Sequence, residues 1–139
     1  MRYKVLVVED DHLIAQLTEV WLRHAGFDVE LAYDGQAGLD AAMGRPDLVI
    51  LDIRLPRLDG FEVLRAMKDD PTLRDVPVIV FSAHVQEMTR QRAIEGGASC
   101  FLAKPFEPSD LIKAVTRCLG DDHAAHPPAA RSPTRGGPP

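Results

Sequence analysis

Short apolar runs alternate with helix-like stretches along most of this chain. Five runs have the bounds expected of strands, because acidic, turn-forming or proline residues lie at their ends: residues 3–8, 28–33, 47–52, 76–82 and 99–103. The third and fourth runs are apolar almost throughout, which is typical of strands that are covered on both faces. The alternation predicts an α/β domain in which a five-stranded parallel sheet lies between helices.

The stretches between these runs have the spacing of helices. In the first stretch an apolar residue recurs every three to four positions, which is the period of a single helix face: Leu13, Leu17 and Trp21, with Ile14 and Val20 alongside. The third stretch places Phe61, Leu64 and Met67 on one side in the same way. We expect these apolar faces to pack against the sheet.

The last two stretches differ in how firmly they are expected to pack. Residues 86–95 are polar almost throughout, with Met88 and Ile94 as the main apolar anchors, so we expect a loosely held helix there. In the last stretch Pro108 stands at a first-turn position and Gly120 just past the expected end, which is the usual asymmetry of helix ends.

The composition changes after residue 120. Residues 121–139 hold five of the eleven prolines and no Val, Ile, Leu, Phe or Met, so they cannot bury enough apolar surface to offset the entropy of ordering. Their two Asp and two Arg cancel, which leaves the net charge of −5 on residues 1–120. We expect one domain over residues 1–120 and a disordered Pro-rich tail or linker start over residues 121–139.

Composition and charge exclude several classes of protein. The two cysteines, Cys100 and Cys118, are too few for a disulfide framework or a zinc site. Acidic residues come too early for a signal peptide and no apolar run reaches membrane length, so we expect a cytoplasmic protein with no membrane partner. The negative net charge argues against direct nucleic-acid binding. A nucleotide enzyme is not expected, because no glycine-rich loop ending in Gly-Lys-Ser/Thr is present.

Polar side chains with useful chemistry follow four of the five expected strands. They are Glu9 and Asp10 after the first run, Asp52 at the end of the third, Ser82 at the end of the fourth and Lys104 after the fifth. In open parallel sheets, ligands bind beyond the carboxyl ends of the strands. One acid at a strand end is more often a turn former than a site, but this combination at four separate ends favours a shared site.

These residue types predict a site for a divalent cation and a phosphoryl group. Crowded carboxylates raise each other's proton affinity unless a cation intervenes, and a few oxygen ligands suit Mg²⁺ beside a phosphate. Carboxylates can accept phosphoryl groups, and Asp52 is the natural acceptor. Lys104 can hold a phosphoryl oxygen. Ser82 has no clear histidine partner, so hydrogen-bond donor is a better role for it than nucleophile.

Four motifs together resemble the receiver domain of bacterial two-component response regulators over residues 3–119. They are "VLVVEDD", "VILDIRLPRLDGFEVL", "VIVFSA" and "FLAKPFEPSDL". The resemblance implies a flavodoxin-like, doubly wound sheet with the strand order 2-1-3-4-5 and five flanking helices.

The resemblance also implies a metal site and a phosphorylation site. Glu9 and Asp10 match the acidic pair that binds Mg²⁺, although an aspartate is commoner at the first of these positions. Asp52 matches the phosphoacceptor. The main-chain carbonyl of Arg54 matches the remaining protein ligand of the metal.

Further positions match the residues that sense the phosphoryl group. Ser82 matches the Ser/Thr that bonds a phosphoryl oxygen, and Lys104 matches the invariant lysine, whose bond to Pro105 is usually cis in the family. Phe101 matches the aromatic switch residue, although an aromatic on an edge strand commonly just packs. Two further side chains, those of Arg54 and His84, match positions near the path of attacking water. We expect them to tune how long the phosphoryl group survives, with Arg54 shielding it.

The resemblance implies a phosphorelay response regulator. A sensor histidine kinase or phosphotransfer protein would donate to Asp52, and Ser82 and Phe101 would then move. The output surface would comprise the helix at residues 86–95, the fifth strand and the last helix, and receivers often form homodimers through the same surface. Such a protein is not an enzyme beyond its own phosphorylation and dephosphorylation.

Two alternatives remain. The chain could be the front of a longer regulator with a DNA-binding or enzymatic output domain. An independent Mg²⁺ phosphohydrolase would share the acidic cluster, but it needs a substrate pocket and a second acid–base group that the sequence does not reveal. The kinase, the signal and the downstream target cannot be read from the sequence.

Overall fold

The structure is a computed structural model that describes residues 2–83 and 86–125. Within these residues, strands and helices alternate from end to end: β1 (Lys4–Val8), α1 (His12–His24), β2 (Asp28–Ala32), α2 (Gly35–Ala42), β3 (Leu48–Asp52), α3 (Gly60–Asp69), β4 (Val78–Ser82), α4 (Glu87–Glu95), β5 (Cys100–Ala103) and α5 (Pro108–Ala125). All neighbouring strands pair in parallel, in the order β2-β1-β3-β4-β5. The expected doubly wound fold and strand order are confirmed.

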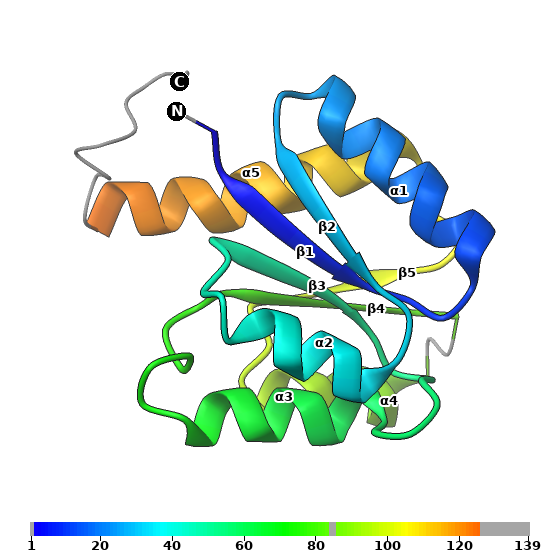
Figure 1. Cartoon of the computed structure of the whole chain (residues 1–139), viewed down its shortest axis with the longest axis vertical. Coiled ribbons are helices and arrows are strands. Elements are labelled where there is room, and N and C mark those ends of the chain that lie inside the picture. Colours follow the sequence, from blue (N-terminus) through cyan, green and yellow to red (C-terminus); the bar gives the residue numbers. More distant parts are fainter. Residues whose placement is uncertain (1, 84–85, 126–139) are drawn as a thin grey trace.

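The sheet separates two layers of helices (Figure 1). Helices α1 and α5 cover one face, and α2, α3 and α4 cover the other. Successive residues of a strand point to opposite faces, so Val49 and Leu51 pack toward α2–α4 while Leu48 and Ile50 pack toward α1 and α5. Every residue of β3 and β4 is buried, as their apolar runs predict.

The expectation for the packed face of α1 is confirmed for Ile14 and Trp21, which are partly buried against the core, and wrong for the other three residues. The buried residues are Ala15, Thr18 and Leu22. Three of the residues expected to pack are exposed instead: Leu13 by 66%, Val20 by 60% and Leu17 by 42%. Apolar residues occur on most sides of this helix, so more than one face has the required spacing. Thr18 is accommodated in the core because its hydroxyl donates to the carbonyl of Ile14 at 2.7 Å.

Helix α4 is loosely attached, as expected, but through different residues. Ala93 is its buried residue, whereas Met88 and Ile94 are exposed. The guanidinium of Arg92 lies 3.9 Å from the ring centroid of Phe61 on α3, which is a cation–π contact. Among the described residues, the small side chain of Ala93 and the Arg92–Phe61 contact thus take the place of the two expected apolar anchors.

Helix α5 does not end before Gly120 as expected, because it continues to Ala125. Alanines at 124 and 125 favour helix, and no proline interrupts the chain until residue 127. The rest of the expected disordered tail, residues 126–139, lies outside the described residues. No helix in the described part of the chain is both long and apolar enough to cross a membrane.

The position of Gly120 inside α5 predicts whether an alanine there raises or lowers the free energy of unfolding. An added Cβ would meet no atom within 4 Å, and alanine is favoured over glycine in a helix interior, so Gly120→Ala should stabilise the fold by about 0.5–1 kcal/mol. Gly26→Ala is the matched control, since its surroundings are equally open but its φ is +100°. That variant should destabilise. Urea denaturation measures both, and a destabilised Gly120→Ala would contradict a continuous α5.

Candidate functional site

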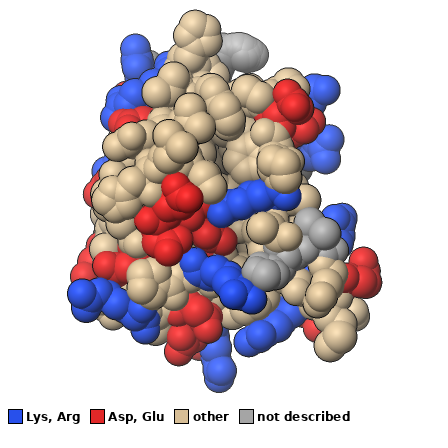
Figure 2. All heavy atoms as spheres, turned by 90° about the vertical axis from the view of Figure 1, so that its right-hand side faces the viewer, with Lys and Arg blue, Asp and Glu red and all other residues tan. Residues whose placement is uncertain are grey.

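Acidic and basic residues meet at the carboxyl edge of the sheet. Figure 2 shows this face, on which acidic side chains gather beside Lys and Arg side chains. Glu9 and Asp10 follow β1 and Asp52 ends β3, and one carboxylate oxygen from each lies within 4.8 Å of the others. Glu9 and Asp52 are buried while Asp10 is exposed, so the cluster opens to solvent beside Asp10.

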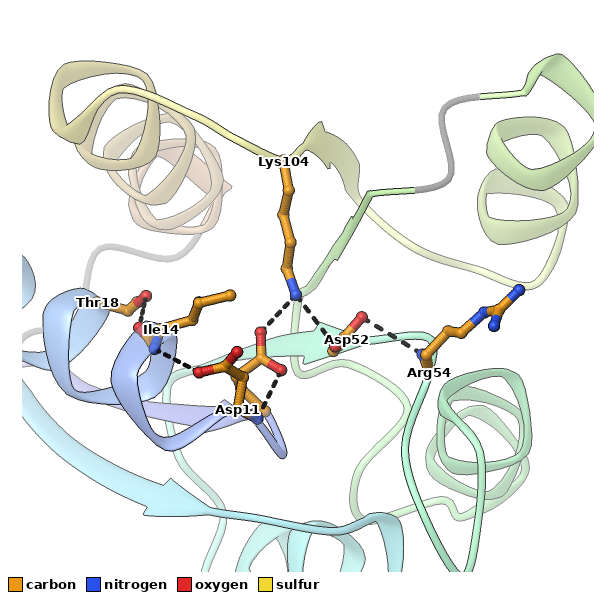
Figure 3. Close-up of polar contacts among 7 residues, drawn as sticks. Asp11, Ile14, Thr18, Asp52, Arg54 and Lys104 are labelled. Atoms are coloured by element: carbon orange, nitrogen blue, oxygen red, sulfur yellow. Dashed lines mark hydrogen bonds and ion pairs between the residues drawn. The ribbon is translucent and has the colours of Figure 1, made fainter.

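Lys104 connects two of these carboxylates. Its Nζ lies 2.5 Å from Oε1 of Glu9 and 3.1 Å from Oδ2 of Asp52 (Figure 3). The backbone places it there, because the Lys104 N–H donates to the carbonyl of Ser82 at 2.8 Å and so extends the pairing of β4 with β5. The ammonium also lies 4.7 Å from the ring centroid of Phe81, a favourable cation–π position.

The loop after β1 is fixed by Asp11, whose structural role sequence analysis missed. The Asp11 N–H donates to Oε2 of Glu9 at 3.1 Å. Oδ1 of Asp11 accepts from the N–H of Ile14 at 3.1 Å and thereby caps α1 (Figure 3). An aspartate directly before a helix pattern is the signal that could have identified this cap.

The loop after β3 lies close to Asp52. The N–H of Arg54 donates to Oδ1 of Asp52 at 3.3 Å, while the Arg54 side chain points away from that carboxylate (Figure 3). Helix α3 begins against the same segment, since Gly60 donates to the carbonyl of Ile53 at 2.8 Å. A Cβ on Gly60 would lie 2.2 Å from the carbonyl oxygen of Asp52, so only glycine fits this approach.

Burial and charge shift the ionisation of two groups. Burial raises the pKa of Glu9 to about 7; the hydrogen bond from Lys104 opposes this rise, and the interaction with Asp52 adds to it. Burial alone would lower the pKa of Lys104, but its hydrogen bond to Glu9 and the charges of Asp52 and Glu9 outweigh burial and raise it. Lys104 is therefore held as a cation at neutral pH.

The donor set fits a divalent metal ion. Three carboxylates converge on one place, and the single ammonium of Lys104 cannot balance all three when they are ionised. Carboxylate oxygens are hard ligands of the kind that Mg²⁺ and similar cations prefer. Glu9, Asp10 and Asp52 are thus the residues that could hold such an ion.

The other expected site residues lie on β4, on β5 or directly after β5, or outside the described part of the chain. Ser82 ends β4 with its side chain fully buried. Phe101, on β5, is partly buried and packs toward the α2–α4 side of the core. The peptide bond between Lys104 and Pro105 is cis, as the resemblance implies. His84 lies outside the described residues.

The comparisons with known proteins agree with this geometry. A family model described as the response regulator receiver domain matches residues 5–116. The chain belongs to this family. The receiver domain is 36% identical over 128 residues to the DNA-binding response regulator MtrA of Mycolicibacterium paratuberculosis, a match covering 90% of this chain and 56% of MtrA.

Two solved structures share the fold of this receiver domain. The chemotaxis protein CheY4 of Vibrio cholerae is 32% identical with a TM-score of 0.80, over 85% of this chain and 99% of that one. The receiver domain of sensor histidine kinase PA1611 from Pseudomonas aeruginosa is 31% identical with a TM-score of 0.80, and the match covers 86% of this chain and 99% of that one. That structure has a magnesium ion coordinated in the active site cleft. This chain spans about half the length of the curated relatives it matches.

The raised pKa of Glu9 predicts how pH and a divalent cation act on stability. Between the unfolded pKa of 4.5 and the folded value of about 7, the unfolded state loses its proton first, so the metal-free fold loses stability as pH rises through this window. A bound cation should compensate the ionised Glu9. Added MgCl₂ should therefore raise the thermal midpoint more at pH 8 than at pH 5.

Thermal unfolding of the receiver domain in EDTA or MgCl₂ measures this effect. Glu9→Gln should weaken both the pH dependence and the response to the cation. Glu95→Gln, at an exposed position on α4, is the control and should respond like the unchanged protein. A cation response that is equal at both pH values would contradict the role of Glu9.

Proposed function

We propose that this receiver domain is a phosphorelay response regulator that accepts a phosphoryl group on Asp52. The donor would be a phosphohistidine on a sensor histidine kinase or a phosphotransfer protein in the cytoplasm. The observation that carries the proposal is the contact of the Lys104 ammonium with the buried carboxylate of Asp52, beside the acids Glu9 and Asp10. A carboxylate with a fixed cation on one oxygen and a metal-binding cluster beside it has the parts of a phosphoryl acceptor site.

Mg²⁺ is the cation that we propose for the cluster. Glu9, Asp10, Asp52 and the main-chain carbonyl of Arg54 would hold it. When bound, the Mg²⁺ ion would neutralise negative charge on the phosphoryl oxygens.

The transfer itself needs little from the protein beyond position and charge. One carboxylate oxygen of Asp52 forms a bond to phosphorus, the N–P bond of the donor breaks, and its electron pair stays on the imidazole nitrogen. Lys104, which is 3.1 Å from Oδ2 of Asp52, is placed to stabilise the negative charge that surrounds the phosphorus. No further catalytic activity is proposed for the chain beyond its own phosphorylation and dephosphorylation.

Phosphorylation would act on the loosely held side of the domain. Ser82 would contact the new phosphoryl group, and Phe101 would repack where Ser82 had been. The readout would be the surface formed by α4, β5 and α5, which would also serve for homodimer formation. The single buried residue of α4 supports this, because few packing contacts oppose its movement. Arg54 and His84 would set the lifetime of the phosphorylated form.

The exposed face of α1 is where we propose that the phosphodonor docks. Leu13, Leu17 and Val20 are exposed on the helix whose capping residue, Asp11, donates its N–H to Glu9 of the acidic cluster. Exposed apolar side chains that recur along one helix face mark a protein contact more often than scattered ones do. A partner on this face would bring its phosphohistidine to the adjacent carboxyl edge of the sheet.

The phosphorylation site is tested with acetyl phosphate. Incubation with acetyl phosphate and MgCl₂ should add one phosphoryl group in the intact mass, and EDTA should prevent the addition. Asp52→Asn should lose the adduct because the amide oxygen is a poor nucleophile. An adduct that persists in this variant would place the site elsewhere, and turnover of a generic phosphate ester without phosphoprotein would favour a phosphohydrolase.

The docking face is tested by comparing phosphorylation by two donors, a histidine kinase and acetyl phosphate. Leu13→Ser with Leu17→Ser should slow transfer from a phosphorylated histidine kinase by about tenfold or more, because removing an apolar side chain from an interface costs about 1 kcal/mol. Phosphorylation by acetyl phosphate should stay within about twofold of the unchanged protein, since both side chains are exposed. Met43→Ser, exposed on the opposite helical layer, is the control. An equal reduction with both donors would contradict docking on α1.

A further inference from the structure

The loop at residues 53–59 follows β3 and lies beside Asp52 of the acidic cluster. Its residue Arg54 donates its N–H to Oδ1 of Asp52 at 3.3 Å. The carbonyl of the same residue would complete the proposed metal site. Because both groups belong to the backbone, the course of the loop decides where they lie, whatever side chain stands at position 54.

The middle of this loop is a tight turn in an unusual conformation. The N–H of Leu58 donates to the carbonyl of Pro56 at 2.8 Å, which closes a three-residue turn around Arg57. Arg57 has a φ of 72°, in the left-handed region that residues with a side chain seldom adopt. A turn of this kind persists only where its surroundings hold it.

The first residue of α2 supplies that hold. The N–H of Gly35 donates to the carbonyl of Pro56 at 3.2 Å. A Cβ built on Gly35 would lie only 1.6 Å from the carbonyl oxygen of Leu58. Two segments that are distant in the sequence therefore touch through their backbones, and no side chain fits between them.

Asp34 anchors this contact but contributes little through charge. Its Oδ1 accepts from the N–H of Ala37 at 2.7 Å, which caps α2 and fixes the start of the helix. Its Oδ2 lies 3.5 Å from Nε of Arg57, but the Arg57 side chain is 74% exposed. Exposed ion pairs contribute little, so the backbone contact at Gly35 is the stronger constraint.

We propose that Gly35 is a positioning residue for the metal site. By holding the turn at residues 56–58, it sets the place of the Arg54 backbone beside Asp52. Gly35 itself contacts neither the metal nor the phosphoryl group. The inference rests on the proposed function only in that it takes a metal to bind beside Asp52.

The first test is Gly35→Ala in the full chain. Isothermal titration with MgCl₂ should show the dissociation constant for Mg²⁺ raised by about tenfold, the scale at which residues that orient metal ligands act. The Mg²⁺ concentration that gives half the maximal rate with acetyl phosphate should rise by a similar factor, while the maximal rate should fall less. Gly120→Ala, where an added Cβ meets no atom within 4 Å, is the matched control and should bind Mg²⁺ normally.

A second pair of variants tests the turn without crowding Gly35. Arg57→Gly and Arg57→Pro both remove the exposed side chain and its ion pair with Asp34. Glycine can adopt a φ of 72°, whereas proline is restricted to about −65°. Arg57→Pro should weaken Mg²⁺ binding by about tenfold, and Arg57→Gly should keep most of the affinity.

The outcomes are distinct. Folded Gly35→Ala and Arg57→Pro variants that bind Mg²⁺ as tightly as the unchanged protein would overturn the positioning role. If Gly35→Ala does not fold, the two Arg57 variants decide, and equal affinities for them would overturn it. Failure of the unchanged protein to bind Mg²⁺ or to form a phosphoprotein would instead overturn the proposed function.

Discussion

The site depends on a lysine placed among buried carboxylates. Glu9 and Asp52 are almost fully enclosed, and Lys104 contacts both. An ionised group buried without a partner costs about 3–5 kcal/mol, so the lysine makes the negative charge tolerable inside the protein. The compensation is incomplete, because burial still raises the pKa of Glu9 to about 7. An arrangement that is stable yet retains unbalanced negative charge is suited to binding a small cation.

The convergence of these residues could be predicted from the sequence because the fold imposes it. Runs such as residues 47–52 and 76–82 are so uniformly apolar that they indicate buried parallel strands, and parallel strands bring their carboxyl ends to one edge. Once the strands were placed, Glu9, Asp10, Asp52 and Lys104 had to lie near one another. The motifs shared with receiver domains supplied the strand order, which is confirmed, and the individual roles, which stay predictions.

Other features could not be predicted because they depend on rotations and contacts that periodicity does not define. Helix α1 has apolar residues on most of its sides, and only its packing against the sheet decides that Leu22 is buried while Leu13 is exposed. Gly120 looked like a helix end, but a glycine signals an end only where the backbone turns left-handed. In the sequence, Gly35 is an ordinary residue at a helix start. Its close approach to Leu58 appears only when two separate loops are placed together.

The exposure of Leu13, Leu17 and Val20 has a consequence for how such a domain can diversify. These side chains are exposed by 42% to 66%, so stability limits their identity less than that of core residues. A duplicated copy could acquire a new set of residues on this face while its core and its acidic cluster stayed unchanged. If the phosphodonor docks on this face, as proposed, such surface changes alone would separate one signalling route from another while the chemistry of the site is kept.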